Sequence, residues 1–331
     1  IAIGYGAGGT NTTGAIIAVG YQSLDANTTG AENVAVGSNS LGANTTANNN
    51  TALGSYTLST NTTGSENTAV GKNALIVNTT GASNVAVGSY ALDANTTASN
   101  NTAMGVNALG ANTEGHNNTA FGLEALAANT TGDYLTAIGN YSLHDNTTAD
   151  HNVAVGRYAL GKNTTGFHNV AVGNYAINEN TTGDENTAMG HLAMATLTTG
   201  DYNTAIGSQA LETCSTGSGN TMVGRTAGEV TTGTDNTGVG FSALRTNTSG
   251  NYNTALGRST MYANTTGDYN VAVGHQALYA HTTGDNSVAV GRNSLYQCTT
   301  GNHNTAVGGS ASLYALTTGT YNTALGVDSG Q

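Results

Sequence analysis

The stretch that decides the fold runs from Asn67 to Ser83 and reads NTAVGKNALIVNTTGAS. Variants of this 17-residue unit fill the chain on both sides. The glycine of the NTAVG block recurs in steps of 17 at Gly20, Gly37, Gly54, Gly71, Gly88, Gly105, Gly122, Gly139, Gly156, Gly173, Gly190, Gly207 and Gly224. The series begins at Gly4 with a step of 16, and it continues with one step of 16 and one of 18 through Gly240, Gly257, Gly274, Gly291, Gly308 and Gly326. Self-similarity at a fixed period is typical of repeat architectures.

Each unit predicts one short β-strand and one turn. Thr68 and Val70 alternate with Ala69, and this two-residue period is typical of a strand with one buried face. Gly71 ends the strand, and the Asn-Thr-Thr-Gly segment at 78–81 has turn residues with a glycine free to take positive φ. A helix is a poor competitor, because a glycine in its interior costs about 1 kcal/mol.

One coil of this size cannot bury its own apolar side chains, so consecutive coils are expected to stack with strands about 4.8 Å apart. The predicted fold is an all-β parallel β-solenoid, a β-roll or β-helix, of about twenty 17-residue coils. It covers residues 1–331 as a single repeat region without a separate domain. We expect a rod on the order of 100 Å long. Aliphatic side chains should lie inside, alanine where surfaces approach closely, and asparagine and threonine along the edges.

The composition argues against several classes of protein. With 47 Gly, no Pro and only 8% charged residues, the chain is far from an ordinary globular domain, but its evenly spaced aliphatic residues argue against disorder. A net charge of −12 with 7 Lys and Arg predicts no nucleic-acid partner, because no basic surface is left to neutralise phosphates. No apolar run approaches the roughly 18 to 20 residues of a membrane-spanning helix, so no membrane insertion is expected.

Cys214 and Cys298 are the only cysteines. They occupy the same repeat position five coils apart. In a straight solenoid the two cysteines would therefore lie about 24 Å from each other. A disulfide allows only about 4.4 to 6.8 Å between Cα atoms. The two cysteines are therefore not expected to pair within one chain.

The NTAVG-x-x-AL-x-x-NTTG unit resembles the repeats of tail-fibre-domain proteins of phages and bacteria, and the resemblance covers the whole chain. Its first block is also similar to the head repeats of trimeric autotransporter adhesins, where a related SVAIG strand recurs in a shorter unit. The resemblance implies an obligate homotrimer, and it implies that an endosialidase-type chaperone domain follows in the full-length protein. The candidate for a close-packed seam of the trimer is an alanine ladder at Ala35, Ala69, Ala86, Ala103 and Ala154.

The Asn-Thr-Thr triplets match the N-glycosylation pattern. The candidate acceptors are Asn11, Asn27, Asn44, Asn61, Asn78, Asn95, Asn129, Asn146, Asn163, Asn180 and Asn264. The alternative is a stacked, hydrogen-bonded turn without glycans. Later repeats favour that alternative, because Thr-Thr-Gly persists nearby while the asparagine position becomes Leu197, Cys214, Val230, His281, Cys298 and Leu316.

Carboxylates collect just after the turn glycine, at Glu32, Glu66, Asp133, Asp184, Asp201, Asp268 and Asp285. A ladder of carboxylates is a candidate Ca²⁺ site, but Ca²⁺ takes six to eight oxygen ligands and most coils offer one carboxylate. A solvated acidic edge is the preferred interpretation. We expect neither a metal nor another cofactor.

Two further ladders raise binding hypotheses. Tyrosines recur at Tyr141, Tyr158 and Tyr175, and again at Tyr279, Tyr296 and Tyr314. Such rings could hold sugars, but packing of each ring on the next coil is the favoured interpretation. The regular threonines also suggest the hypothesis of ice binding. Ice binding is not expected, because Thr68 and its equivalents are predicted to point into the core or a seam.

No catalytic triad, phosphate loop or metal-ligand cluster is recognisable, so an enzyme is not expected. The chain begins at Ile1 in mid-repeat without a signal-peptide pattern, which predicts a fragment or a processed product. The predicted function is that of an extracellular structural shaft, a phage tail-fibre or bacterial surface filament that assembles with copies of itself on a virion or cell surface. The alternative is an adhesin that contacts host-surface glycans through its Tyr and Asn ladders.

Overall fold

The structure, a computed structural model, describes residues 1–330 and contains β-strands and turns but no helix within them. It is an all-β parallel β-solenoid of about 19 turns with roughly 17 residues per turn, which confirms the predicted fold class. The chain divides into two compact units, Ile1–Phe167 and His168–Gln331. Both units are built from the same repeat.

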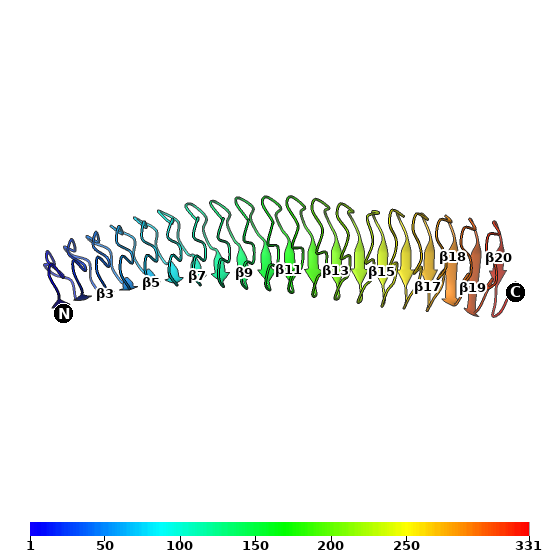
Figure 1. The fold of residues 1–331 in the computed structure, drawn as a ribbon, viewed down its shortest axis with the longest axis horizontal. Coiled ribbons are helices and arrows are strands. Elements are labelled where there is room, and N and C mark those ends of the chain that lie inside the picture. The colour runs from blue at the N-terminus through cyan, green and yellow to red at the C-terminus, as the bar shows by residue number, and fades with distance from the viewer. Residues whose placement is uncertain (331) are drawn as a thin grey trace. The chain divides into compact units, whose positions relative to one another are not determined.

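In the first unit each coil contributes one short strand, and the strands lie side by side in coil order (Figure 1). These strands are β1 (Ala2–Ile3), β2 (Ile16–Val19), β3 (Asn33–Val36), β4 (Thr51–Leu53), β5 (Thr68–Val70), β6 (Val85–Val87), β7 (Thr102–Met104), β8 (Thr119–Phe121), β9 (Thr136–Ile138) and β10 (Val153–Val155).

The second unit follows the same plan. Its strands are β11 (Val170–Val172), β12 (Thr187–Met189), β13 (Thr204–Ile206), β14 (Thr221–Val223), β15 (Thr237–Val239), β16 (Thr254–Leu256), β17 (Val271–Val273), β18 (Val288–Arg292), β19 (Thr305–Ser310) and β20 (Thr323–Leu325). The register shifts between Val290 and Arg292, just ahead of the coil that carries the longer step.

Equivalent residues of neighbouring coils pair directly. Between β5 and β6 the register aligns Ala69 with Ala86, and the flanking residues follow in parallel. Backbone hydrogen bonds also join coils outside the strands. Leu75 N donates to Ala91 O at 3.0 Å, and Thr79 N donates to Thr96 O at 2.8 Å. Stacking therefore satisfies the backbone on several sides of the coil, as the repeat predicted.

The interior is narrower than the sequence pattern suggested. Ala69, Ala74 and Leu75 are completely buried, whereas Thr68 and Val70 point outward and are only half-buried. Thr68 and its equivalents were predicted to point into the core or a seam, and the first of these alternatives was wrong. The alanine ladder is enclosed within each single coil, so it cannot form a seam between chains. We call the position of Ala69 the strand alanine and the position of Val70 the outer aliphatic.

In one coil a larger residue at one buried position is matched by a smaller residue at another, a pairing that we call the volume exchange. It shows which positions face each other across the interior. Met222 stands at the strand-alanine position, and Gly228 stands where other coils have the buried leucine. A Cβ atom on Gly228 would lie 2.8 Å from Cγ of Met222. The larger residue on one side is thus accommodated by the smaller one on the other, as close packing requires.

Residues in the left-handed backbone conformation, with positive φ, allow the chain to close such a small coil. Gly71, which follows the strand, has φ of +123°, and a Cβ there would lie 2.7 Å from the carbonyl carbon of Gly88 in the next coil. We call this position the bend glycine. Non-glycine residues are left-handed as well, including Asn73 at 61°, Leu75 at 51° and Ser83 at 57°. Each such residue costs roughly 1 to 2 kcal/mol, so packing and hydrogen bonds between coils must hold them in place.

Candidate functional site

The candidate glycosylation sites lie inside the solenoid. Asn11, in the first coil, is half-buried. The other ten are completely enclosed, namely Asn27, Asn44, Asn61, Asn78, Asn95, Asn129, Asn146, Asn163, Asn180 and Asn264. We call the position that these residues share the turn asparagine.

The amide of each turn asparagine is used for hydrogen bonding within the stack. Asn78 Nδ2 donates to Asn61 Oδ1 of the preceding coil at 2.8 Å and to the carbonyl oxygen of Gly81 at 3.0 Å. The same nitrogen would carry an N-glycan. A glycan would remove a donated hydrogen bond and would have to leave through a packed coil, so the geometry favours the structural alternative for these residues.

A second buried ladder, on the strand side, was expected at an edge and lies in the interior instead. Asn67 Nδ2 donates to the carbonyl oxygen of Gly81 at 2.9 Å, and its Oδ1 accepts from the backbone N–H of Asn84 at 3.0 Å. The two asparagines of a coil therefore meet at one glycine carbonyl. The sequence signal was present, since asparagine recurs here in most repeats, but polarity suggested the surface. The asparagines of these two ladders cannot form a glycan-contacting face.

Most replacements at the turn asparagine keep the position buried, whereas Leu316, near the end of the chain, is half-buried. Cys214 and Cys298 are enclosed and unpaired, as predicted, and each Sγ lies 3.8 Å from the carbonyl oxygen that the asparagine amide would contact. Burial raises the pKa of the Cys214 thiol to about 11. In the shortened coil the buried residue is Thr231, whereas Val230, which the repeat spacing had aligned here, is exposed.

His281 interrupts the ladder. It is completely buried, and its Nε2 lies 2.7 Å from the carbonyl oxygen of Gly284. Within residues 1–330, its Nδ1 and the Oδ1 of Asn264 in the preceding coil have no hydrogen-bond partner. Desolvation by burial lowers the pKa of the His281 imidazole. Unpartnered buried polar atoms are costly, so this coil is a weak point of the second unit.

The aspartates predicted to form a solvated edge are half-exposed, and several of them also accept hydrogen bonds from the backbone. Asp285 Oδ1 accepts from the N–H of Asp268 at 2.8 Å, and Asp201 Oδ1 accepts from that of Asp184 at 2.8 Å. Glu32 and Glu66 fall one repeat position later and are exposed. Among residues 1–330, no group of three or more His, Cys, Asp or Glu side chains could hold a metal ion.

Tyrosines stack from coil to coil, as favoured from the sequence. Tyr279 and Tyr296 have ring centroids 5.1 Å apart and planes 6° apart, and Tyr296 and Tyr314 are also 5.1 Å apart. Tyr262 extends this row at 5.2 Å from Tyr279. Stacking covers the ring faces, which are the surfaces that sugars would contact. The row therefore offers mainly ring edges and hydroxyl groups.

Two carboxylates lie within hydrogen-bond distance of the imidazole of His144, a cluster that was not predicted from the sequence. His144 Nδ1 lies 2.6 Å from Asp145 Oδ1, and its Nε2 lies 3.2 Å from Glu124 Oε2. Both ring nitrogens are occupied by carboxylates, so neither is left to activate a nucleophile. All three side chains are substantially exposed, and such ion pairs contribute little to stability.

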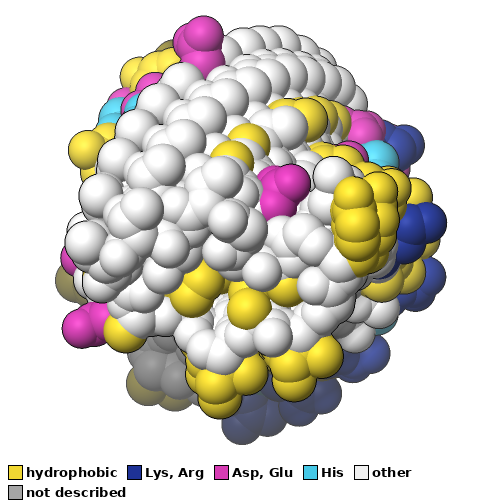
Figure 2. Space-filling view, turned by 90° about the vertical axis from the view of Figure 1, so that its left-hand side faces the viewer, with side chains coloured by type: hydrophobic (Ala, Val, Ile, Leu, Met, Phe, Trp, Pro, Cys, Tyr) yellow, Lys and Arg dark blue, Asp and Glu magenta, His cyan; other side chains and the backbone are white. Residues whose placement is uncertain are grey.

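The outward side of the strands carries large apolar residues. At the outer-aliphatic position, Leu53 is 49% exposed, Phe121 51% and Met189 49%. Figure 2 shows hydrophobic side chains in separate clusters with polar surface between them. We call the row of outer aliphatics within each unit its outer apolar face.

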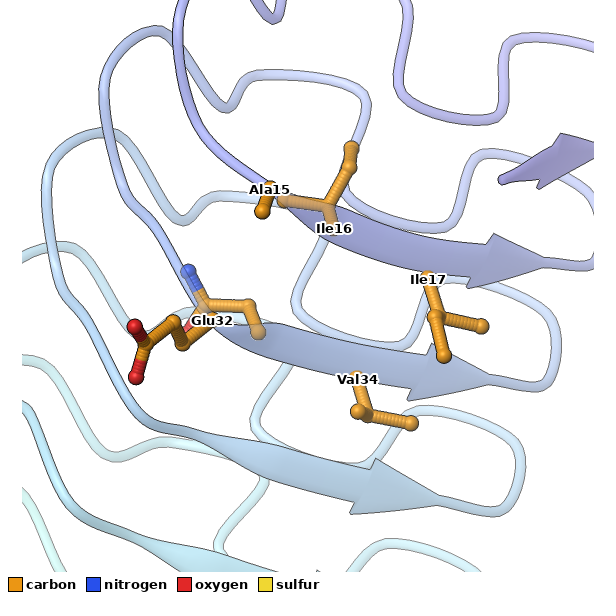
Figure 3. Close-up of a pocket in the computed structure, with 6 residues that line it drawn as sticks. Ala15, Ile16, Ile17, Glu32 and Val34 are labelled. Carbon is orange, nitrogen blue, oxygen red and sulfur yellow. The ribbon is translucent and has the colours of Figure 1, made fainter.

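One hollow on an apolar surface lies near the start of the first unit and measures about 250 Å³. It is lined by Ala15, Ile16, Ile17, Glu32, Asn33 and Val34. Figure 3 shows the Glu32 carboxylate directed away from Ile17 and Val34. The hollow is smaller than the roughly 300 to 1,000 Å³ of small-molecule sites, and it lacks converging polar groups.

Comparison with known protein families found no family model that matches the chain, and comparison with curated proteins found no match. Residues 1–330 include no helix that is long and apolar enough to cross a membrane.

Proposed function

We propose that this chain is a non-catalytic structural shaft of an extracellular fibre, of the phage tail-fibre or bacterial surface-filament kind. The observation that carries the proposal is the coil-to-coil bonding inside each unit. Backbone ladders and two buried asparagine ladders join each coil to the next, as for Asn78 and Asn61. A stack bonded in this way resists bending and offers proteases few free segments. The resemblance of the repeat to tail-fibre domains supports the same function.

The shaft assembles with copies of itself as a homotrimer, and its outer apolar face is the surface that supports this step. Exposed apolar rows of this kind mark interaction sites in soluble proteins. Leu53, Phe121 and Ile138 in the first unit are each at least 41% exposed in the single chain. Burial against a second chain would remove these side chains from water at roughly 25 cal/mol per Å². The alanine ladder, being internal, has no part in the contact.

The test is the native mass of the purified chain and of two double variants. Wild type is expected near three chains of 33.0 kDa each. Leu53→Lys with Phe121→Lys places two charges on the outer apolar face and is expected to release single chains with an unchanged β-sheet spectrum. Thr80→Lys with Thr97→Lys adds the same charge at exposed turn positions and should leave the mass unchanged. A wild-type mass of one chain would contradict the proposed assembly.

A further inference from the structure

One column of the second unit is basic in an otherwise acidic chain. It lies at the position that follows the bend glycine, and its members in consecutive coils are Arg225, Phe241, Arg258, His275 and Arg292. All five side chains are exposed. The whole chain has only 7 Lys and Arg against 19 Asp and Glu, so three arginines in one column concentrate the few positive charges. We call these five residues the arginine column.

Backbone hydrogen bonds fix the column in register. Ser242 N donates to the carbonyl oxygen of Arg225 at 3.0 Å, and Gln276 N donates to that of Arg258 at 3.1 Å. The paired strands β14 to β18 lie directly alongside. Neighbouring coils are about 4.8 Å apart, so arginines in alternate coils repeat at about 10 Å.

The column is preorganised and its charge is not neutralised. The guanidinium groups of Arg225 and Arg258 lie 5.9 and 5.7 Å from the ring centroid of Phe241, one in the coil before and one in the coil after. Cation–π contacts of this kind hold the arginine side chains against the surface. Within residues 1–330, no carboxylate pairs with Arg225, Arg258 or Arg292. In contrast, Arg245 on another side of the coil is bound to Glu229 at 2.6 Å.

The flanks of the column are free of acidic residues. On the strand side lie outer aliphatics such as Val239 and Leu256, which are 39% and 38% exposed. On the other side lie the half-buried Ser259 and Gln276. The surface thus combines evenly spaced guanidinium groups, an apolar strip and neutral hydrogen-bonding groups along one line.

We propose that the arginine column binds a linear acidic polysaccharide whose sulfate or carboxylate groups recur at about every second sugar. Guanidinium groups recognise such anions through paired hydrogen bonds. The even spacing suits a repeating ligand, and the apolar strip suits the apolar faces of sugar rings. This binding site goes beyond the role of a shaft and does not depend on it.

Two other polyanions fit less well. Duplex DNA carries one charge per roughly 1.7 Å of its axis, a far denser spacing than the roughly 10 Å between arginines in the column. A second copy of this chain offers aspartates such as Asp268 and Asp285, but each already accepts a backbone hydrogen bond through its Oδ1. The observations therefore favour a glycan.

The test measures binding of the full chain to dextran sulfate, to alginate as a carboxylated probe, to single-stranded DNA as a different polyanion, and to neutral dextran of matched length. Binding to at least one acidic probe is expected, with none to neutral dextran. Three arginine contacts predict a slope of about −2 for log affinity against log salt, by analogy with single-stranded polyanions.

Variants localise the site. Arg258→Gln should weaken binding about tenfold, the value of one hydrogen bond to a charged group, and replacing all three column arginines by Gln should abolish it. Lys72→Gln is the matched control, because Lys72 holds the same repeat position in the first unit, between the uncharged Ser55 and Ser89 of the adjacent coils. Equal losses for Lys72→Gln and Arg258→Gln would overturn the proposal, as would binding to neutral dextran, no binding to either acidic probe, or tighter binding to single-stranded DNA than to both glycans. Unchanged thermal melting confirms that each variant is folded.

Discussion

Asn78 donates its side-chain amide to Oδ1 of Asn61, 2.8 Å away and one coil earlier, in the closed interior of the solenoid. The contact repeats along the stack, for example from Asn95 to Asn78 at 2.9 Å. Each amide therefore serves as donor to one neighbour and acceptor to the other. A residue that reads as a glycan acceptor in the sequence is a structural element in the fold.

Removing one rung of this ladder should weaken the first unit. Asn78→Ala deletes a donor to Asn61 and leaves a buried acceptor unpaired, which costs about 1 to 3 kcal/mol. The expected result is a lower urea midpoint by circular dichroism. The control Thr80→Ala, at an exposed turn position, should leave the midpoint nearly unchanged. Equal midpoints for wild type and Asn78→Ala would show that the ladder adds no stability.

Repairing the interrupted ladder should stabilise the second unit. His281→Asn supplies the missing donor to Asn264 and restores the repeat consensus. The gain should be largest in acid. Burial lowers the pKa of His281 below its ordinary value of 6.5, so the unfolded chain binds the proton more readily than the folded one. The stability that the neutral, buried His281 side chain gives the wild type is fully present above pH 6.5. This stability is lost as the pH falls below 6.5.

The measurement for this substitution is the melting temperature at several pH values between 4 and 8, roughly the range over which histidine titrates. The difference between His281→Asn and wild type should widen as the pH falls. A difference that stays constant across the range would contradict the assigned titration.

A methyl group at the bend glycine should be incompatible with stacking. Gly71→Ala places a Cβ 2.7 Å from the Gly88 carbonyl carbon and forces alanine into φ of +123°. Strain and overpacking together predict a loss of about 2 kcal/mol or more. Gly42→Ala is the matched control, because its nearest atoms would lie 3.6 Å away, at ordinary contact distance. Similar urea midpoints for the two variants would refute the steric argument.

The volume exchange around Met222 predicts non-additive mutations. Met222→Ala alone leaves a cavity, and Gly228→Leu alone places a side chain against Met222. Each should destabilise the chain by about 1 to 3 kcal/mol. The double variant restores the consensus pair and should recover most of the loss. Additive losses in the unfolding midpoints would mean that the two positions do not face each other.

The buried thiols should be inert in the folded chain. Burial raises the pKa of Cys214 to about 11, so little thiolate is present near pH 8. A maleimide or disulfide reagent should label neither Cys214 nor Cys298 until the chain is unfolded in guanidinium, where both should react. Rapid labelling under native conditions would show that these coils open.

The sequence by itself determined the period, the strand, the turn and the stacking of coils in register. These features follow from local chemistry repeated every 17 residues, as in the unit from Asn67 to Ser83. The stacked tyrosines and the separation of the two cysteines follow from the same period, because equivalent residues of adjacent coils must lie one strand spacing apart.

Only the tertiary structure decided which side of each strand faces inward. Ala69 lies on one face of the strand, and Thr68 and Val70 lie on the other. Both faces carry apolar groups, so the polarity of the residues could not decide which face is buried. The coil is narrow enough that only a methyl group fits opposite Leu75, which turns the larger residues outward. Asparagine becomes an interior residue for a related reason. The turn asparagine Asn78 donates to Asn61 of the preceding coil and accepts from Asn95 of the following one, and these partners are in place only once the coils have stacked.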